Sequence, residues 1–339
     1  MVDLLSFGLL LTVAFATAPR KCYPWLFTIH VLIIGVLIPF LIHDNEKGLK
    51  IQSGMARLIK EGGALPKRPL GKTGVEVTIL GLGGEGILRT FGQEQEAVPL
   101  IQQAIDLGIT YFESARAYSG SESYYGMALK ERRREIFLAS KSHERKGDGA
   151  LKHLEVSLAT MKTDYLDLWM IHDVRTTKDL DMIFGPKGAA KAFEAAKRNK
   201  LVRFVGISGH RNPTVLSRAL DLFPFDTVLM PVNPAEPHYW SFLQDVLPKA
   251  QSKGMGILGM KTLSRGVCTK IFGVESVENF LRFAISQPIS AAVVGCETIE
   301  QLEMNVRMAK SFQPMPVKDQ EVFIQKVKSY ARELMYYKL

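Results

Sequence analysis

Four side chains that can hold or transfer protons come after successive apolar runs of the chain. Glu113 and Tyr118 follow one such run, and Lys141 follows the next. His172 follows the run after that. If these runs are neighbouring strands of a parallel sheet, their carboxyl ends share one edge. The sequence therefore predicts that a carboxylate, a phenol, an ammonium and an imidazole meet at one rim.

This combination suits the reduction of a carbonyl group. A tyrosine with its ordinary pKa of about 10 is a poor proton donor at neutral pH. A nearby ammonium favours the phenolate, so we expect Lys141 to lower the pKa of Tyr118. Glu113 would anchor the lysine, and His172 would hold the carbonyl oxygen. Each residue alone is more often structural; their order at successive strand ends favours a joint role, in which Tyr118 supplies a proton while hydride reaches the carbon.

Short apolar runs alternate with segments of helical period from residue 67 onward. The expected strands are Val77–Leu82, Thr110–Phe112, Ile136–Ser140, Leu166–Ile171, Val202–Ile207, Thr227–Met230, Gly256–Met260 and Ala291–Val294. The expected helices lie near 94–107, 121–131, 149–161, 187–199, 213–221, 239–252, 275–286 and 298–311. Apolar strands separated by helices favour a parallel sheet. Eight such units in about 270 residues fit an α/β fold, the closed (β/α)8 TIM barrel.

A doubly wound open sheet is the alternative architecture. It would carry a glycine-rich phosphate-binding turn after its first strand, but Gly81–Gly86 lacks the GxGxxG spacing. Ahead of the first strand, Arg68–Gly74 and Val75–Val77 predict a hairpin that closes the amino-terminal end of the barrel.

Two apolar stretches precede the barrel. Residues 4–18 form the first, and residues 25–42 form a second one without any charge, which as a helix would reach about 27 Å. Ala16–Ala18 resembles a signal-peptide cleavage site, although no positive charge precedes it. A membrane hairpin or an anchor without full crossing is the alternative. We predict a hydrophobic, transmembrane or otherwise anchoring segment at 1–42, a linker at 43–66 and the barrel domain at 67–339.

Charge and cysteine content narrow the partners and the compartment. More Lys and Arg follow the second stretch than precede it, so the positive-inside rule places the barrel on the cytoplasmic side of a membrane bound through residues 4–42. The net charge of +9 comes from short basic clusters without interleaved aromatics, so no nucleic-acid partner is expected. Three widely spaced cysteines make a disulfide framework or a zinc site improbable.

From about residue 67 to 312 the chain resembles the aldo-keto reductase family. The motifs that carry the resemblance are Arg68–Gly74, "GITYFESARAY" at Gly108–Tyr118, Ser121–Glu122, "LASK" ending at Lys141, "DYLDLWMIHD" at Asp164–Asp173, "VRFVGISGH" at Val202–His210 and "VVGCETIEQLEMN" at Val293–Asn305. The resemblance implies NADPH-dependent reduction of a small aldehyde or ketone, with NADH left open. It makes Tyr118 the proton donor, with Lys141 and His172 as partners, and puts Glu113 where the family has aspartate.

The resemblance also indicates where the cofactor would bind. The corresponding positions are Ser208, Gly209, Asn233, Met260, Lys261, Gln301 and Asn305. Several depart from the family pattern: Gly209 replaces an asparagine, Pro234 replaces a glutamine after Asn233, and Met260 replaces a stacking tyrosine. Lys261 or Arg265 would supply charge for a phosphate.

Two further functions compete with that of a membrane-anchored reductase. The predicted anchor and the departures from the family pattern also suit a non-catalytic, nucleotide-sensing subunit of a membrane complex. A barrel hydrolase or isomerase has little support, because no HxH or carboxylate–histidine metal cluster is evident at a strand end, and no metal ligand is assigned. Apolar residues of the expected pocket loops suggest a lipophilic carbonyl; they are Leu88, Phe91, Val174, Phe184 and Trp240.

Overall fold

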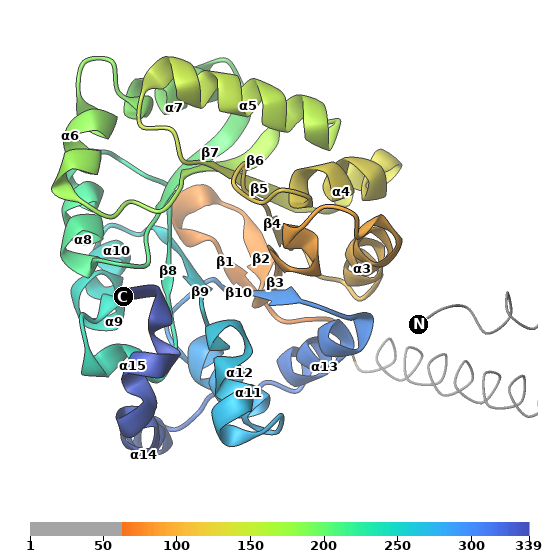
Figure 1. Ribbon diagram of the computed structural model, residues 1–339, viewed down its shortest axis with the longest axis vertical. Helices are drawn as coiled ribbons and strands as arrows, with labels where there is room; N and C mark the ends of the chain where they lie inside the picture. Colours follow the sequence, from red (N-terminus) through yellow and green to blue (C-terminus); the bar gives the residue numbers. More distant parts are fainter. Residues whose placement is uncertain (1–62, 339) are drawn as a thin grey trace, which may run out of the picture. The chain divides into compact units, whose positions relative to one another are not determined.

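The computed structural model describes residues 63–338, whose strands close into a parallel barrel in the order β10-β3-β4-β5-β6-β7-β8-β9 (Figure 1). The strands are β1 Lys67–Pro69, β2 Glu76–Thr78, β3 Leu80–Gly86, β4 Tyr111–Glu113, β5 Phe137–Ser142, β6 Leu166–Ile171, β7 Val202–Ser208, β8 Thr227–Pro231, β9 Gly256–Met260 and β10 Ala291–Cys296. The helices are α3 Glu94–Asp106, α4 Ser121–Ala128, α5 Gly147–Met161, α6 Thr177–Phe184, α7 Ala189–Arg198, α8 Pro213–Leu222, α9 Phe242–Asp245, α10 Leu247–Ser252, α11 Val267–Phe272, α12 Ser276–Ser286, α13 Ile299–Lys310, α14 Val317–Val327 and α15 Ala331–Leu334. The predicted (β/α)8 barrel is confirmed, and the open sheet is excluded because the strand order closes on itself.

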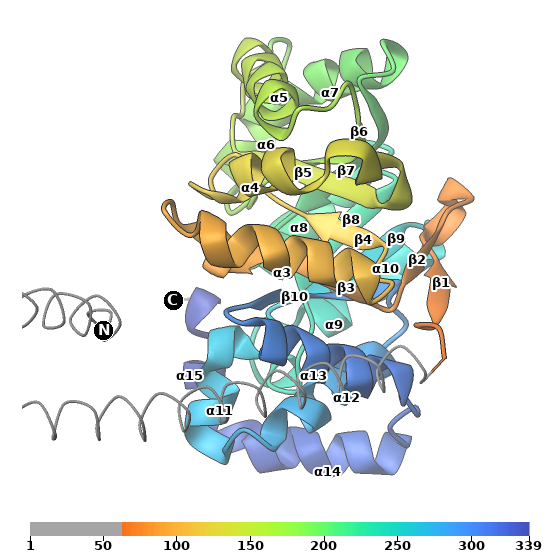
Figure 2. The same cartoon turned by 90° about the vertical axis from the view of Figure 1, so that its right-hand side faces the viewer.

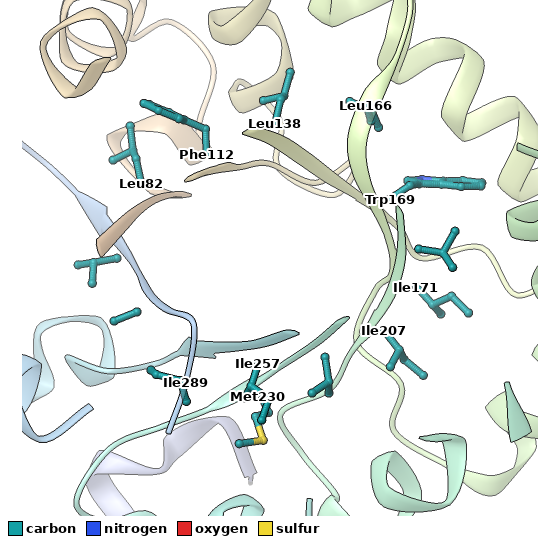
Figure 3. Packing of buried hydrophobic residues seen from close by; sticks show 14 of the residues in the cluster. Leu82, Phe112, Leu138, Leu166, Trp169, Ile171, Ile207, Met230, Ile257 and Ile289 are labelled. Carbon is teal, nitrogen blue, oxygen red and sulfur yellow. The ribbon is translucent and has the colours of Figure 1, made fainter. Parts of the chain in front are cut away.

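Alternation along the strands divides the core into two layers. Leu82, Leu138 and Trp169 point outward from the ring of strands toward the helices (Figure 3). Trp169 stacks on Phe193 of α7 with ring centroids 3.7 Å apart. Neighbouring residues along the same strands point inward, and Tyr111 fills the barrel so closely that a Cβ on Gly81 would lie 2.6 Å from its ring. Both faces of each strand are therefore apolar, which is why the runs read as continuously hydrophobic.

The predicted hairpin closes the amino-terminal end of the barrel. β1 pairs antiparallel with β2, and Gly74 adopts a left-handed conformation in the connection. Leu70 and Val77 are buried among the inward-facing barrel residues, and Lys72 N donates to Gly254 O at 2.9 Å. The hairpin and the carboxyl end of the chain lie at opposite ends of the barrel (Figure 2). The carboxyl-terminal rim of the strands is thus left for a site.

Several helices depart from the predicted pattern. The segment between β6 and β7 holds α6 as well as the expected α7. A capping box formed by Thr176 and Asp179 starts α6, which at eight residues is too short to show a clear helical period in the sequence. The single helix expected at 239–252 is instead α9 and α10, with Pro248 in the first turn of α10. A proline cannot donate the backbone hydrogen bond of a continuing helix. α11, α14 and α15 were not predicted.

The predicted anchor at 1–42 lies outside the described residues, as does the linker at 43–66 except for its last four residues. Within residues 63–338, the helices are too short or too polar to cross a bilayer. Residues 63–338 belong to one compact unit. Cys268 and Cys296 are both free and buried.

Candidate active site

Glu113 and Lys141 form a buried ion pair at the carboxyl ends of β4 and β5. Glu113 is in register with Ala139, so Lys141 lies two residues farther along β5 on the same inward face. Glu113 Oε1 lies 2.5 Å from Lys141 Nζ, and Nζ also donates to Ser114 O at 2.9 Å. The two side chains are 6% and 1% exposed. The extra methylene of glutamate, compared with the aspartate of the family pattern, therefore does not prevent the pairing.

Tyr118 lies beside this pair, in the loop after β4. Lys141 Nζ lies over its ring, 5.0 Å from the centroid, and the Arg89 guanidinium lies 5.1 Å from the same centroid. Contrary to the expected lowering by Lys141, burial and the carboxylates of Glu113 and Glu85 raise the pKa of Tyr118 well above 10. The reason is that Glu113 neutralises the ammonium, while the phenolate form would be desolvated among carboxylates.

His172 completes the group from the end of β6. Its ring meets the Tyr118 ring edge to face, with centroids 5.7 Å apart. Burial, reinforced by the charge of Lys141, lowers the pKa of His172 well below 6.5, so the ring is neutral at pH 7. Its Nδ1 is buried without a hydrogen-bond partner in the described part of the chain. A neutral imidazole can donate one hydrogen bond from a ring nitrogen, which suits a carbonyl oxygen.

The backbone of His172 is fixed by a residue that the sequence interpretation missed. Arg145 donates to His172 O and Asp173 O at 2.8 Å each, and to Asp179 Oδ1 at 3.0 Å. Arg145 lies in the loop after β5, four residues beyond Lys141. Arg145 and His172 are far apart in the sequence, and no sequence pattern links them. They come into contact because β5 and β6 are neighbouring strands.

A cavity of about 930 Å³ opens at this rim, within the size range of small-molecule sites. Residues of the predicted site on its wall are Glu113, Tyr118, Met260, Lys261, Gln301 and Asn305. Asn305 Oδ1 is buried without a hydrogen-bond partner among the described residues, so the wall retains an acceptor for a ligand. The cavity is large enough for a nicotinamide dinucleotide, and it extends from Gln301 and Asn305 to Tyr118.

One wall of the cavity carries a cluster of charges around Glu85. Arg89 pairs with Glu85 Oε1 at 2.6 Å, Lys261 lies 3.9 Å from the same oxygen, and Arg265 lies 3.6 Å from Oε2. Three cations face one carboxylate, so the wall has a net positive charge suited to phosphate. Glu85 and Arg89 were not predicted as site residues, although Glu85 belongs to the glycine-rich segment of β3 and Arg89 to the 3₁₀ turn that follows it. Tyr336, from the carboxyl-terminal segment, also lines the cavity and was missed.

The other predicted cofactor positions lie outside the cavity wall. Ser208 Oγ accepts from Asp173 N at 3.0 Å and donates to Ile171 O at 3.2 Å, so it braces the end of β6. Gly209 N donates to Leu229 O. Asn233 is fully buried, and its amide donates to Tyr337 Oη at 2.8 Å and to Lys261 O at 3.2 Å. These three positions support the rim in this structure, because backbone groups and the carboxyl-terminal segment satisfy their polar atoms.

The apolar pocket expected from the loops is not formed by the predicted residues. Leu88 and Val174 are buried in the core, whereas Phe91 and Trp240 are 68% and 50% exposed. Phe184 packs against aromatic rings that follow α8. The cavity wall takes its apolar atoms mainly from other segments, including Val267, Val274, Val277, Val293 and Val294.

A carboxylate–histidine cluster, which the sequence interpretation did not find, also lies at this rim. His143 and Glu144 follow β5 directly, and His153 comes from the second turn of α5. One ligand atom of each lies within 4.8 Å of the others. The sequence indicates part of this cluster, since His143 and Glu144 are adjacent after a strand. The path of the loop brings His153 to them, and the sequence does not predict that path.

Comparison with known proteins agrees with the barrel fold. A model of the aldo/keto reductase family matches residues 79–274. L-galactose dehydrogenase from Arabidopsis thaliana is 27% identical over 296 residues, which cover 75% of this chain and 91% of that protein. The solved aldo-keto reductase AKR11C1 from Bacillus halodurans, in its holo form, is 23% identical with a TM-score of 0.65, covering 78% of this chain and 96% of that one.

A second solved structure, an aldo-keto reductase from Klebsiella pneumoniae in complex with NADPH, is 18% identical with a TM-score of 0.65 and covers 78% of this chain and 95% of that one. These two structures support the fold. The family itself is established by the family model, which matches more than half of the chain. On this match, the chain belongs to the aldo/keto reductase family.

Proposed function

We propose that the protein is an oxidoreductase that uses NADPH to reduce an aldehyde or ketone to an alcohol, with Tyr118 as proton donor. The observation that supports this most strongly is the buried Glu113–Lys141 pair beneath Tyr118, beside a neutral His172. A charge pair of this kind is costly to bury and adds little to stability on balance. Its position under a tyrosine at the wall of a large cavity is explained by a catalytic role.

NADPH fits the cavity beside these residues. Gln301 and Asn305 of α13 would hold the adenosine end, and Met260 would line the nicotinamide end. When bound, NADPH supplies the hydride that reaches the carbonyl carbon. The proposal that NADPH is preferred to NADH is supported by the cations around Glu85, which provide charge for an additional phosphate.

The side chains of the protein handle the oxygen and the proton. His172, neutral at pH 7, donates a hydrogen bond that orients the carbonyl oxygen. The raised pKa of Tyr118 keeps its hydroxyl group protonated until negative charge develops on the carbonyl oxygen. That oxygen is then more basic than a phenolate and takes the Tyr118 proton. The phenolate formed lies beside the Lys141 ammonium, and solvent returns a proton to it. One hydride and one proton are added to the carbonyl, giving the alcohol.

The first test is turnover by the purified full-length protein. We expect consumption of NADPH with a panel of small aldehydes and ketones, and formation of the alcohol in equal amount. Parallel fluorescence titrations with NADPH and NADH measure the cofactor preference. Tight binding of NADPH without turnover of any carbonyl in the panel would overturn the proposal and favour a nucleotide-sensing role.

Attachment to a membrane is a separate proposal, and it rests on the sequence alone. Residues 4–42 would hold the protein in a bilayer, with the barrel on the cytoplasmic side. A bilayer position would favour a lipophilic carbonyl, although the residues expected to form an apolar pocket do not line the cavity. Carbonate extraction and protease protection of membrane vesicles test the attachment and the sidedness. Recovery of the full-length chain in the carbonate supernatant would contradict the attachment.

A further inference from the structure

The cluster after β5 has the composition and geometry of a transition-metal site, and no role in carbonyl reduction requires it. Two histidines and one glutamate each present a ligand atom, and the three atoms lie within 4.8 Å of one another. Two histidines and a carboxylate, with a fourth position left to water, are a ligand set that Zn²⁺ accepts. Zinc–ligand bonds of about 2.1 Å place tetrahedral ligands about 3.4 Å apart, so the ligand atoms need to approach one another by at most about 1.4 Å.

The cluster contains one mobile ligand and two supported ones. His143 is exposed, so its ring can rotate toward a metal, whereas Glu144 and His153 are half-buried. The two histidine rings already lie edge to face, with centroids 4.7 Å apart. A metal would therefore need mainly rotation of His143, while the backbone stays in place.

A second layer orients the ligands. Ser142 Oγ lies 3.0 Å from His153 Nδ1 and accepts a hydrogen bond from Glu144 N at 3.2 Å. This contact occupies one ring nitrogen of His153 and leaves Nε2 free to bind a metal. A hydrogen bond from the non-ligating nitrogen of a histidine is the usual way in which a metal ligand is fixed. Ser142 is fully buried at the end of β5, so its position is fixed by the barrel.

We propose that His143, Glu144 and His153 bind Zn²⁺, which then joins the loop after β5 to helix α5. The next residue in that loop is Arg145, which holds the backbone carbonyl oxygens of His172 and Asp173. A bound zinc ion therefore restrains the segment that positions His172. The site is independent of NADPH binding, since none of its three ligands lines the large cavity.

Zinc stoichiometry of the full-length protein tests this proposal. The purified protein, freed of metal with a chelator and dialysed, is titrated with Zn²⁺ by calorimetry. We expect His143→Ala and His153→Gln each to lose one zinc equivalent, because two remaining ligands hold zinc weakly. Ser142→Ala should keep the equivalent but weaken it about 10- to 100-fold, since it removes only the orienting contact. The matched control is Glu155→Gln, an exposed carboxylate on α5, which should bind zinc as the wild type does.

A thermal melt guards against loss of the fold in the variants. His143 is exposed, so His143→Ala should melt like the wild type without metal. When Zn²⁺ is added, the wild type and Glu155→Gln should gain stability, whereas His143→Ala and His153→Gln should not. Equal zinc stoichiometry in wild type, His143→Ala and His153→Gln would overturn the proposal. Because none of these readouts involves a carbonyl, the zinc site and the reductase activity can fail independently.

Discussion

Removing the charge of Glu113 should cost stability as well as activity, and the structure sets the size of that cost. In Glu113→Gln the side chain keeps its shape, but Lys141, which is 1% exposed, loses the only carboxylate within salt-bridge distance among the described residues. Breaking one partner of a buried ion pair costs about 3–5 kcal/mol. With an unfolding entropy of about 2.1 cal/mol/K per residue, this corresponds to a fall of roughly 5–9 °C in Tm for the barrel of about 270 residues.

Urea unfolding at pH 7 measures this cost. Tryptophan fluorescence can report it because Trp169 is buried against Phe193 and becomes exposed on unfolding. Glu155→Gln on the surface of α5 is the matched control and should change the free energy of unfolding by less than about 0.5 kcal/mol. In a double variant, Lys141→Met with Glu113→Gln, at least half of the lost stability should return, because no buried charge remains unpaired.

A small loss of stability in Glu113→Gln would contradict this expectation. If Glu113→Gln lost less than about 1 kcal/mol, Lys141 would not depend on Glu113 for its charge. The pair could then not explain how Lys141 is held in its charged form under Tyr118. Loss of equal stability in the single and double variants would likewise show that shape, and not charge, matters at this position.

Other parts of the rim give further expectations. The pKa of His172 is lowered in the folded state, so the unfolded chain binds more protons and the protein becomes less stable as the pH decreases. Between pH 7.5 and 5.5 this residue should account for a loss of about 1.4 kcal/mol in the free energy of unfolding. The loss is measured as the difference between wild type and His172→Gln. Lys338→Met leaves the fully buried Glu236 without its cationic partner at 2.9 Å and should lower the free energy of unfolding in urea by about 3–5 kcal/mol. An unchanged urea midpoint would show that the carboxyl-terminal segment is not bound as described. Lys261→Gln should weaken NADPH binding about 10- to 100-fold in fluorescence titrations and leave NADH binding nearly unchanged; an equal loss for both cofactors would place the lysine away from the additional phosphate.

The barrel could be predicted because its strands are buried on both faces. Runs such as Leu166–Ile171 and Gly256–Met260 coincide with β6 and β9 as expected. Strand ends were less accurate: β5 continues to Ser142, since Lys141 is a buried inward-facing residue of the strand although its type suggests a loop. Polarity indicates where a strand ends only when the polar side chain reaches solvent.

The candidate site, like the barrel, could be predicted from the sequence only in part. The order of strands brought Glu113, Lys141 and His172 together, as the sequence predicted, because neighbours in a barrel follow chain order. The contacts of Arg145, Tyr336 and Tyr337 depend on loops and on the last turns of the chain, whose paths no periodicity predicts. The direction of the Tyr118 pKa was also predicted incorrectly, because burial and the pairing of Lys141 outweigh the simple proximity of an ammonium.

The central claim, that Tyr118 gives its proton to the carbonyl oxygen, is tested most directly by the kcat of Tyr118→Phe with NADPH and the best aldehyde of the panel. Loss of a general acid of this kind lowers rates about 10²- to 10⁴-fold. We predict a fall in kcat within that range, with the affinity for NADPH unchanged within about threefold, because the substitution removes only a hydroxyl group. A Tyr118→Phe variant that retains more than about a tenth of the wild-type kcat would contradict this account.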